Sequence, residues 1–188
     1  MKIGVLAVQG AFIEHEKMLS GLGCECIELR KKSDICSIDG LVLPGGESTV
    51  QGKLLHELDM YEPIKDIIQS NTPVLATCAG LILLAEHISN DSNVYFGTMP
   101  ITVKRNAYGR QLGSFTYYSQ FADMENVEMT FIRAPYIEEV NDGVSVLSTV
   151  ENKIVAARYN NQVGLAFHPE LGADRRIHEY FLDIIKNN

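Results

Sequence analysis

One cysteine occupies a position where chemistry is expected. In the stretch "PVLATCAGLILLAE", residues 73–77 have strand character and run directly into Cys78, and a helical pattern starts at Ala79. A sharp strand-to-helix turn projects its central side chain outward and needs small flanking residues, which here are Ala76 and Gly80. The N-terminus of a helix favours a thiolate, the reactive form of the side chain. Cys78 is therefore a candidate nucleophile, with an ordinary buried cysteine as the alternative.

A thiol nucleophile normally needs a base, and the sequence offers His168. This residue ends the apolar run "QVGLAFH", and Glu170 follows two positions later. In an extended chain that spacing points both side chains to one side, so the carboxylate can orient the imidazole as in a catalytic triad. The alternative is a strand-end histidine beside a turn glutamate. The other histidines lie in helical patterns beside glutamates and are predicted to be solvated surface residues: His15, His56, His87 and His178.

A glycine-rich segment supplies the third candidate site. "PGGEST", residues 44–49, follows a predicted strand but lacks the Gly-Lys-Ser/Thr ending of a phosphate loop, which disfavours nucleotide binding. Gly45 and Gly46 leave backbone N–H groups open, and such a nest can hold an oxyanion or a carboxylate. The alternative is a plain turn in which Ser48 caps the next helix.

These candidate sites depend on an alternation of strands and helices. Buried strands are predicted at residues 2–8, 24–29, 40–46 and 73–77, and they alternate with helical patterns at residues 11–22, 48–58, 62–69 and 79–88. The alternation predicts an α/β fold with a mostly parallel central sheet and helices on both faces. All three sites then share the edge at the carboxyl ends of the strands, where open sheets bind ligands.

The second half of the chain has a different pattern. It consists of strand-like runs joined by short turns, with asparagines at hairpin positions, followed by a helix over residues 174–186. The strand-like runs are residues 101–106, 110–118, 129–135, 144–150, 153–160 and 162–168. We expect residues 1–188 to form one domain with a small antiparallel extension.

Composition excludes several classes of protein. Hydrophobic residues make up 46% and charged residues 21%, which is typical of globular domains. A net charge of −8 disfavours nucleic-acid binding, and no apolar run is long enough to span a membrane. Without a signal peptide, the four cysteines are predicted to be free thiols in a reducing compartment, the cytoplasm. No second cysteine pair or His-Glu-x-x-His motif occurs, so no metal site is expected.

The motifs together resemble a known family. "PGGEST", "TCAG" and "FHPE", in this order, resemble class I, triad-type glutamine amidotransferase domains. With "GVLAVQGAFIEH", "RNAYGRQ" and "FIRAP" added, residues 4–171 look like the glutaminase subunits of pyridoxal 5′-phosphate synthases. The resemblance implies a flavodoxin-like fold and hydrolysis of L-glutamine to glutamate and ammonia without a cofactor. It also implies that the ammonia passes to a partner, a TIM-barrel synthase subunit.

The resemblance also implies roles for individual residues. Cys78 would be the nucleophile, His168 the base and Glu170 its orienter, and the N–H groups of Gly46 and Ala79 would form the oxyanion hole. Residues 9–10 would lie near the partner interface. Glutamine would contact Gly46, Glu47, Ser48, Arg105, Ile132 and Arg133.

The charges of glutamine fit these residues. Its carboxylate suits a bidentate fork from Arg105 or Arg133, and its ammonium suits Glu47. One departure from the family pattern is Ala76, because the turn before the nucleophile usually opens with glycine. We expect the extra methyl to be accommodated.

Two other functions fit the residues less completely. A standalone thiol amidohydrolase or peptidase of the same fold would use the same three residues without a partner. A non-enzymatic thiol sensor or interaction subunit would need Cys78 but neither His168 nor Glu170, and often a resolving cysteine.

Overall fold

A large sheet of ten strands forms the centre of the structure, a computed structural model that describes residues 1–105 and 113–188. Its parallel part contains β2 (Glu25–Leu29), β1 (Lys2–Leu6), β3 (Gly40–Leu43), β4 (Val74–Thr77) and β12 (Gln162–Leu165), side by side in that order. Every residue of β3, β4 and β12 is buried. Continuous apolar strands of this kind are expected where helices cover both faces of a parallel sheet.

The sheet continues in mostly antiparallel pairing. The strand order after β12 is β11 (Lys153–Tyr159), β9 (Tyr136–Val140), β6 (Met99–Lys104) and β5 (Ala85–Ile88), and β10 (Val144–Val150) pairs with β11. Asn152 and Asn160 have φ angles of +62° and +51° in the turns before and after β11. Asparagine tolerates this left-handed conformation, so the predicted hairpin turns are confirmed.

A second, two-stranded sheet forms the antiparallel extension. It pairs β7 (Ser114–Phe121) with β8 (Met124–Ile132). The backbone of Ala122 donates to Leu147 of β10 over 2.8 Å, and the backbone of His168 donates to Thr130 of β8 over 2.8 Å. The small sheet is therefore attached both to the central sheet and to the segment that follows β12.

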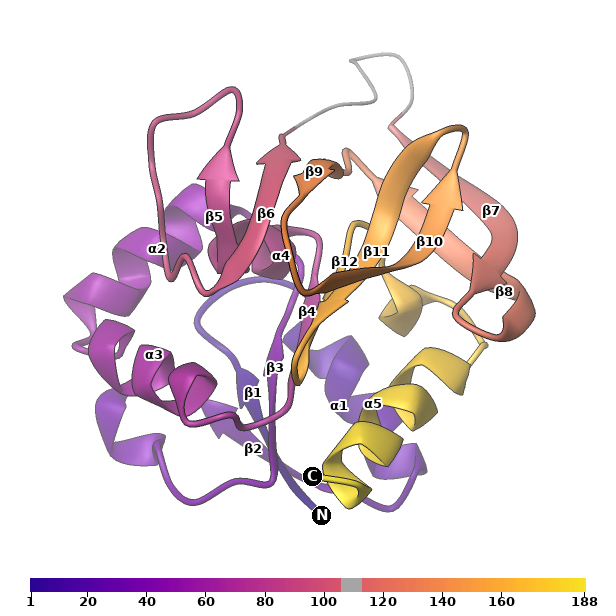
Figure 1. Cartoon of the computed structure of the whole chain (residues 1–188). Coiled ribbons are helices and arrows are strands. Elements are labelled where there is room, and N and C mark those ends of the chain that lie inside the picture. Colours follow the sequence, from indigo (N-terminus) through magenta and orange to yellow (C-terminus); the bar gives the residue numbers. More distant parts are fainter. Residues whose placement is uncertain (106–112) are drawn as a thin grey trace.

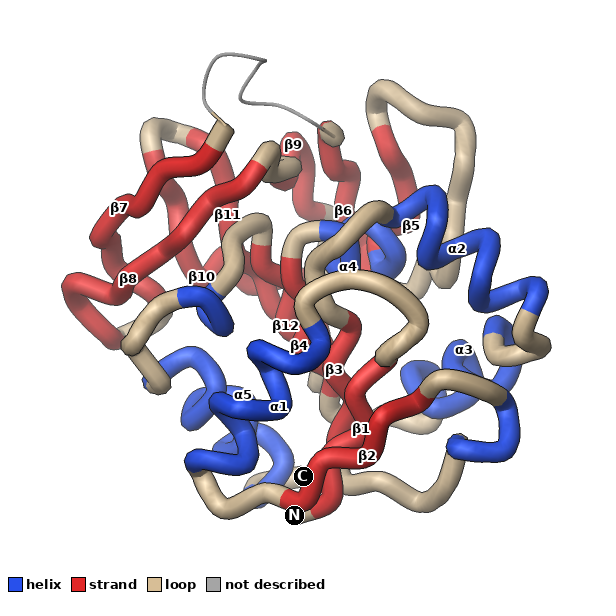
Figure 2. The backbone as a smooth tube through the Cα atoms, turned by 180° about the vertical axis from the view of Figure 1, so that it is seen from behind, coloured by secondary structure: helices blue, strands red, loops and turns tan. Residues whose placement is uncertain are grey.

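Helices lie on both sides of the parallel strands, as predicted (Figures 1 and 2). One side carries α2 (Ser48–Glu57) and α3 (Tyr61–Gln69), and the other carries α1 (Phe12–Gly21) and α5 (Arg176–Lys186). The helix α4 (Ala79–Leu84) is buried along its whole length, and short 3₁₀ turns occur at η1 (Lys32–Asp34) and η2 (Pro169–Leu171). In the described part of the chain, no helix is long and apolar enough to cross a membrane.

Two elements differ from the sequence prediction. The helix expected over residues 79–88 ends at Leu84, and β5 begins at the next residue. Backbone N–H groups of Phe96 and Thr98 donate to the carbonyls of Leu83 and Leu84, each over 2.9 Å. Because these two carbonyls accept hydrogen bonds from outside the helix, the helix does not continue, and the chain forms a strand beside β6. The strand β9 was not predicted at all.

Candidate active site

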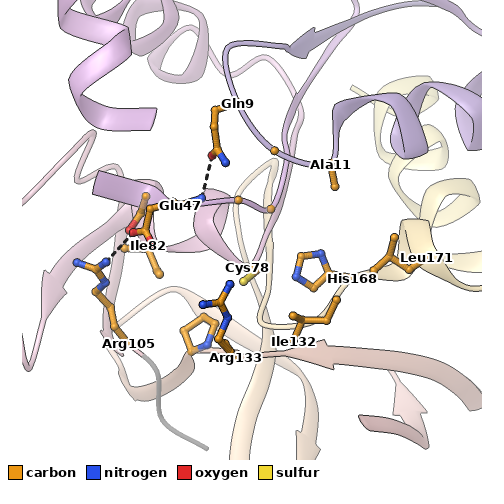
Figure 3. Close-up of a pocket in the computed structure, with 15 residues that line it drawn as sticks. Gln9, Ala11, Glu47, Cys78, Ile82, Arg105, Ile132, Arg133, His168 and Leu171 are labelled. Carbon is orange, nitrogen blue, oxygen red and sulfur yellow. Dashed lines mark hydrogen bonds and ion pairs between the residues drawn. The ribbon is translucent and has the colours of Figure 1, made fainter. Parts of the chain in front are cut away.

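A pocket of about 370 Å³ opens at the carboxyl ends of the parallel strands. That volume lies within the range of small-molecule sites. Most of the residues predicted to act at the site line this pocket, as do Gln9 and Gly10 (Figure 3). Glu170 and Ala79 are not among the lining residues. The predicted residues that line it are Gly46, Glu47, Ser48, Cys78, Arg105, Ile132, Arg133 and His168.

The strand-to-helix turn at Cys78 has the sharp geometry that the sequence predicted. Cys78 has φ +48° and ψ −98°, a conformation that costs a non-glycine residue about 1–3 kcal/mol. A methyl group on Gly80 would lie 2.1 Å from the backbone oxygen of Leu43, so this flank must remain glycine. On the other flank Ala76 is fully buried between its strand partners Leu43 and Gly164. The turn therefore forms with alanine at this position.

His168 and Glu170 form a direct, buried pair. Nδ1 of His168 lies 2.7 Å from Oε1 of Glu170, and the carboxylate side chain is fully buried. The sequence prediction invoked an extended chain, which is wrong, because Glu170 lies in the 3₁₀ turn η2 with Pro169 at its start. The tight turn brings the two side chains together across the proline.

The pKa of His168 reflects this pair and the neighbouring thiol. Burial opposes the charged imidazolium, but hydrogen bonds to Cys78 and Glu170 and the charges of both groups outweigh it and raise the pKa to about 10. Burial likewise opposes the charge on Glu170, yet His15 and His168 hold the pKa of this carboxyl below its ordinary value. At neutral pH the site thus holds an imidazolium between a carboxylate and a sulfur.

The glycine-rich loop packs directly against this pair. Its Gly45 N–H donates to Oγ1 of Thr77 over 2.9 Å, and Glu47 N–H donates to the side-chain oxygen of Gln9 over 2.9 Å. A methyl group on Gly45 would lie 2.2 Å from Cε1 of His168 and 3.3 Å from Cβ of Cys78. Only glycine lets the loop approach so closely.

The start of α2 differs from the alternative considered for this loop. The N-cap residue is Glu47, whose carboxylate accepts from the backbone N–H of Thr49 over 3.4 Å. Ser48 is the first helical residue, and its buried hydroxyl has no hydrogen-bond partner in the described part of the chain. It is therefore available to a ligand in the pocket.

The two predicted arginines are in different states. Arg105 lies 2.5 Å from Asp91 and 2.9 Å from Glu47, and it also donates to Thr49 over 3.3 Å. Arg133 has a φ of +42°, is exposed at the pocket, and forms no ion pair with any described residue. The guanidinium of Arg133 is thus the one left open to an anionic ligand.

Comparison with known proteins then decides the family. The model of the SNO glutamine amidotransferase family matches residues 5–187. The chain belongs to this family. A solved structure titled glutamine amidotransferase is 36% identical to this amidotransferase and has a TM-score of 0.92, with 98% of each chain covered.

Curated relatives of the amidotransferase cover its whole length. A protein named pyridoxal 5′-phosphate synthase subunit PdxT, from Desulfitobacterium hafniense (strain Y51), is 64% identical over 188 residues, which are 100% of this chain and 94% of the relative. A protein of the same name from Methanocorpusculum labreanum is 56% identical over 186 residues, with 98% of each chain covered.

Two histidines of the amidotransferase were predicted wrongly. His15 and His178 are fully buried, whereas His56 and His87 are exposed as expected. His15 lies behind the pocket, with Nε2 3.4 Å from Oε2 of Glu170. Helical spacing does indicate that both histidines are buried, although the neighbouring glutamates suggested otherwise. His15 precedes the buried Leu19 by four residues, and His178 precedes the buried Phe181 by three, so each pair shares one face of its helix.

Part of one predicted motif falls outside the described residues. In "RNAYGRQ" the structure describes Arg105 but not residues 106–111. Within the described part, no group of three or more His, Cys, Asp and Glu side chains is placed to hold a metal ion. All four cysteines are free thiols: Cys24, Cys26, Cys36 and Cys78.

Proposed function

We propose that this amidotransferase is the glutaminase subunit of a pyridoxal 5′-phosphate synthase. In this proposal residues 1–188 act as one domain that hydrolyses L-glutamine and delivers the ammonia to a TIM-barrel synthase subunit. The observation that carries the proposal is the buried pair of His168 and Glu170, joined to the strained Cys78 at the floor of the pocket. Its 64% identity to a protein named as such a subunit gives independent support.

The first half of the reaction releases ammonia. The proton shared between Cys78 and His168 rests on the imidazole, and the thiolate paired with this imidazolium attacks the side-chain amide carbon of glutamine. The oxyanion that forms accepts hydrogen bonds from the N–H groups of Gly46 and Ala79. Gly46 lines the pocket and Ala79 opens α4, where the first N–H groups have no partner within the helix. His168 then protonates the nitrogen as the C–N bond breaks, which leaves a thioester on Cys78.

The second half regenerates the enzyme. His168, neutral again, removes a proton from water as the water oxygen attacks the thioester carbon. The same N–H groups hold the second oxyanion, which collapses with loss of the sulfur. Glutamate leaves, and the departing thiolate of Cys78 is again paired with the imidazolium of His168. Throughout, Glu170 fixes the imidazole through the 2.7 Å hydrogen bond to Nδ1.

Charge and polarity within the pocket support one orientation of glutamine. Arg133 takes the carboxylate, because Arg105 is already paired with Asp91 and Glu47. The half-exposed carboxylate of Glu47 faces the ammonium, and Arg105 acts through it by holding its position. The unpartnered hydroxyl of Ser48 is a further contact, and the side chain of Ile132 packs along the substrate's methylenes.

The rim of the pocket supports a protein partner. Gln9 and Gly10 lie on this rim, and the first turns of α1 and α2 beside it expose Ile13 and Val50. Leu171, another exposed apolar side chain, also lines the pocket. Apolar groups around a polar cleft are typical of a surface that a partner covers. The four free thiols favour a reducing compartment, so we place the reaction in the cytoplasm.

A thiol sensor is less well supported. The resolving cysteine of such a sensor has to approach Cys78, which lies at the carboxyl end of β4. Cys24 and Cys26 lie at the opposite, amino end of the parallel sheet, just before and at the start of β2. The close pairing of His168 with Glu170 also has no role in a sensor.

Glutamate release with and without the synthase subunit tests the proposal. We expect weak turnover by the isolated chain and a clear increase when the partner is added; equal rates would refute the coupling. Cys78→Ala should lower turnover by orders of magnitude, because members of a triad act as a unit. Cys36→Ala, at an exposed thiol, is the matched control. Turnover near wild type in Cys78→Ala would refute the assigned nucleophile.

A further inference from the structure

Behind the pocket, two buried histidines extend the row of polar groups that starts at Cys78. His15 of α1 lies with Nε2 3.4 Å from Oε2 of Glu170, and with Nδ1 3.0 Å from Nε2 of His178 in α5. His15 and His178 are both fully buried, and neither lines the pocket. They therefore contact no substrate in the proposed reaction, although they lie next to its carboxylate.

The hydrogen-bond partners decide where the protons of these rings lie. Oε1 of Glu170 is occupied by His168, whereas Oε2 has no well-aligned hydrogen-bond donor in the described part of the chain. A lone pair on Nε2 of His15 would face this carboxylate oxygen and repel it, so the proton belongs on Nε2. Nδ1 of His15 then carries the lone pair and accepts from the Nε2–H of His178.

His15 also reaches the other side of the site. Its Nε2 lies 3.2 Å from Oγ1 of Thr77, the residue before Cys78. The same hydroxyl oxygen accepts the N–H of Gly45, which fixes the glycine-rich loop. One imidazole thus contacts the carboxylate that orients His168 and the residue that anchors the loop.

Both rings are neutral at physiological pH. Burial lowers the pKa of His15, against the charge of Glu170, while His168 lowers it further and Glu14 raises it. Burial and the neighbouring His15 also lower the pKa of His178, to about 3. A neutral ring with one fixed tautomer can donate to Glu170 without removing its negative charge.

We propose that His15 is a positioning residue for the proposed triad. Its protonated Nε2 donates to Oγ1 of Thr77 and, at 3.4 Å, attracts the second oxygen of Glu170 electrostatically. The first oxygen thereby stays directed at His168, and His178 sets the tautomer that makes this possible. This inference rests on the proposed function and adds a residue that acts through Glu170 and touches neither glutamine nor Cys78.

Three substitutions separate positioning from packing. His15→Gln keeps an N–H near the place of Nε2, His15→Asn keeps polar atoms only near the place of Nδ1, and His15→Leu fills the space without a donor. In complex with the synthase subunit, the Asn and Leu variants should lose about 10- to 100-fold in kcat, the effect known for groups that orient metal ligands in enzymes, with little change in KM. The Gln variant should recover most of the rate. His87→Gln, at an exposed histidine, is the control.

A second measurement needs neither glutamine nor the partner. Alkylation of Cys78 by iodoacetamide, followed across pH by mass spectrometry of its peptide, reports how well His168 supports the thiolate. A misaligned Glu170 stabilises the imidazolium less, so the midpoint of the alkylation profile should move to higher pH in the Asn and Leu variants. It should return toward wild type in the Gln variant. Circular dichroism identifies any variant that fails to fold. If His15→Leu fails to fold, comparison of the Asn and Gln variants decides between positioning and packing.

The outcomes are distinguishable from failure of the proposed function. If folded Asn and Leu variants match wild type in kcat and in the alkylation profile, the positioning role is overturned. Equal losses in all three variants would also overturn it, because they indicate packing alone. If wild type itself shows no glutaminase activity with the partner, the proposed function fails, and the alkylation profiles still decide the role of His15.

Discussion

Acid should destabilise this protein through His178. Burial and the neighbouring His15 lower the pKa of His178 from 6.5 to about 3, and Glu170 opposes them only in part. In the unfolded chain the imidazole of His178 becomes protonated near pH 6.5, whereas in the folded protein it becomes protonated only near pH 3. Stability from the neutral ring is therefore fully present above pH 6.5 and is lost as the pH falls toward 3.

The size of this effect follows from the difference between the two pKa values. At roughly 1.36 kcal/mol per unit, the gap between 6.5 and about 3 corresponds to about 5 kcal/mol across the whole window, and to about 3 kcal/mol at pH 4.5. Domains of this size are stable by about 5–15 kcal/mol, so the loss is a large share of the total. The lowered pKa of His15 acts in the same direction.

Urea unfolding at pH 7.5, 6.0 and 4.5 measures this loss in wild type and in His178→Gln. Glutamine does not titrate, and its amide can replace the donor to His15. Between pH 7.5 and 4.5 the free energy of unfolding should fall by about 3 kcal/mol less in the variant than in wild type, since one titrating group is removed. His87→Gln changes the same residue type on the surface and is the control. If the free energy of unfolding depends on pH equally in wild type and in His178→Gln, the reasoning is refuted.

Three further predictions concern the pocket and the turn at Cys78. Gly45→Ala places a methyl group 2.2 Å from Cε1 of His168, so glutamate release should fall by at least about 100-fold, the effect of a misplaced catalytic group; near-normal rates would contradict this packing. Gly80→Ala places one 2.1 Å from the backbone oxygen of Leu43, and urea unfolding should show a loss of about 1–3 kcal/mol; unchanged stability would mean that α4 can shift. Arg133→Lys removes a bidentate fork, so KM for glutamine should rise about 10-fold with kcat nearly kept; an unchanged KM would assign the carboxylate to another residue.

The parallel half of the fold was predictable because burial on both faces makes each strand a short apolar run. The boundary between α4 and β5 was not predictable by the same criterion. Residues 79–85 are all buried, so no periodicity separates the end of the helix from the start of the strand. The pairing of Ala85 with Met99 decides it, and that contact joins segments apart in the sequence.

Part of the candidate site was likewise predictable from the sequence, and part was not. Cys78, His168 and Glu170 were predictable because each stands at the end of a recognisable strand or two positions beyond it. Helical spacing pointed to the burial of His15 and His178, but their contact with each other was not predictable, because their hydrogen bond joins α1 to α5 across 163 positions of sequence. Neighbouring glutamates suggested a solvated surface, yet both histidines point inward, while Glu14 and Glu16 are half-buried and only Glu179 is exposed.

The strained backbone at Cys78 has a consequence for how such a chain can evolve. Its φ of +48° and ψ of −98° lie in a region that glycine enters freely and other residues enter at a cost. For the backbone alone, glycine is the preferred residue at this turn, so under the proposed mechanism it is the chemistry of the thiol that retains cysteine there. A lineage released from the need for this reaction would be expected to drift toward glycine at position 78 and to keep its fold.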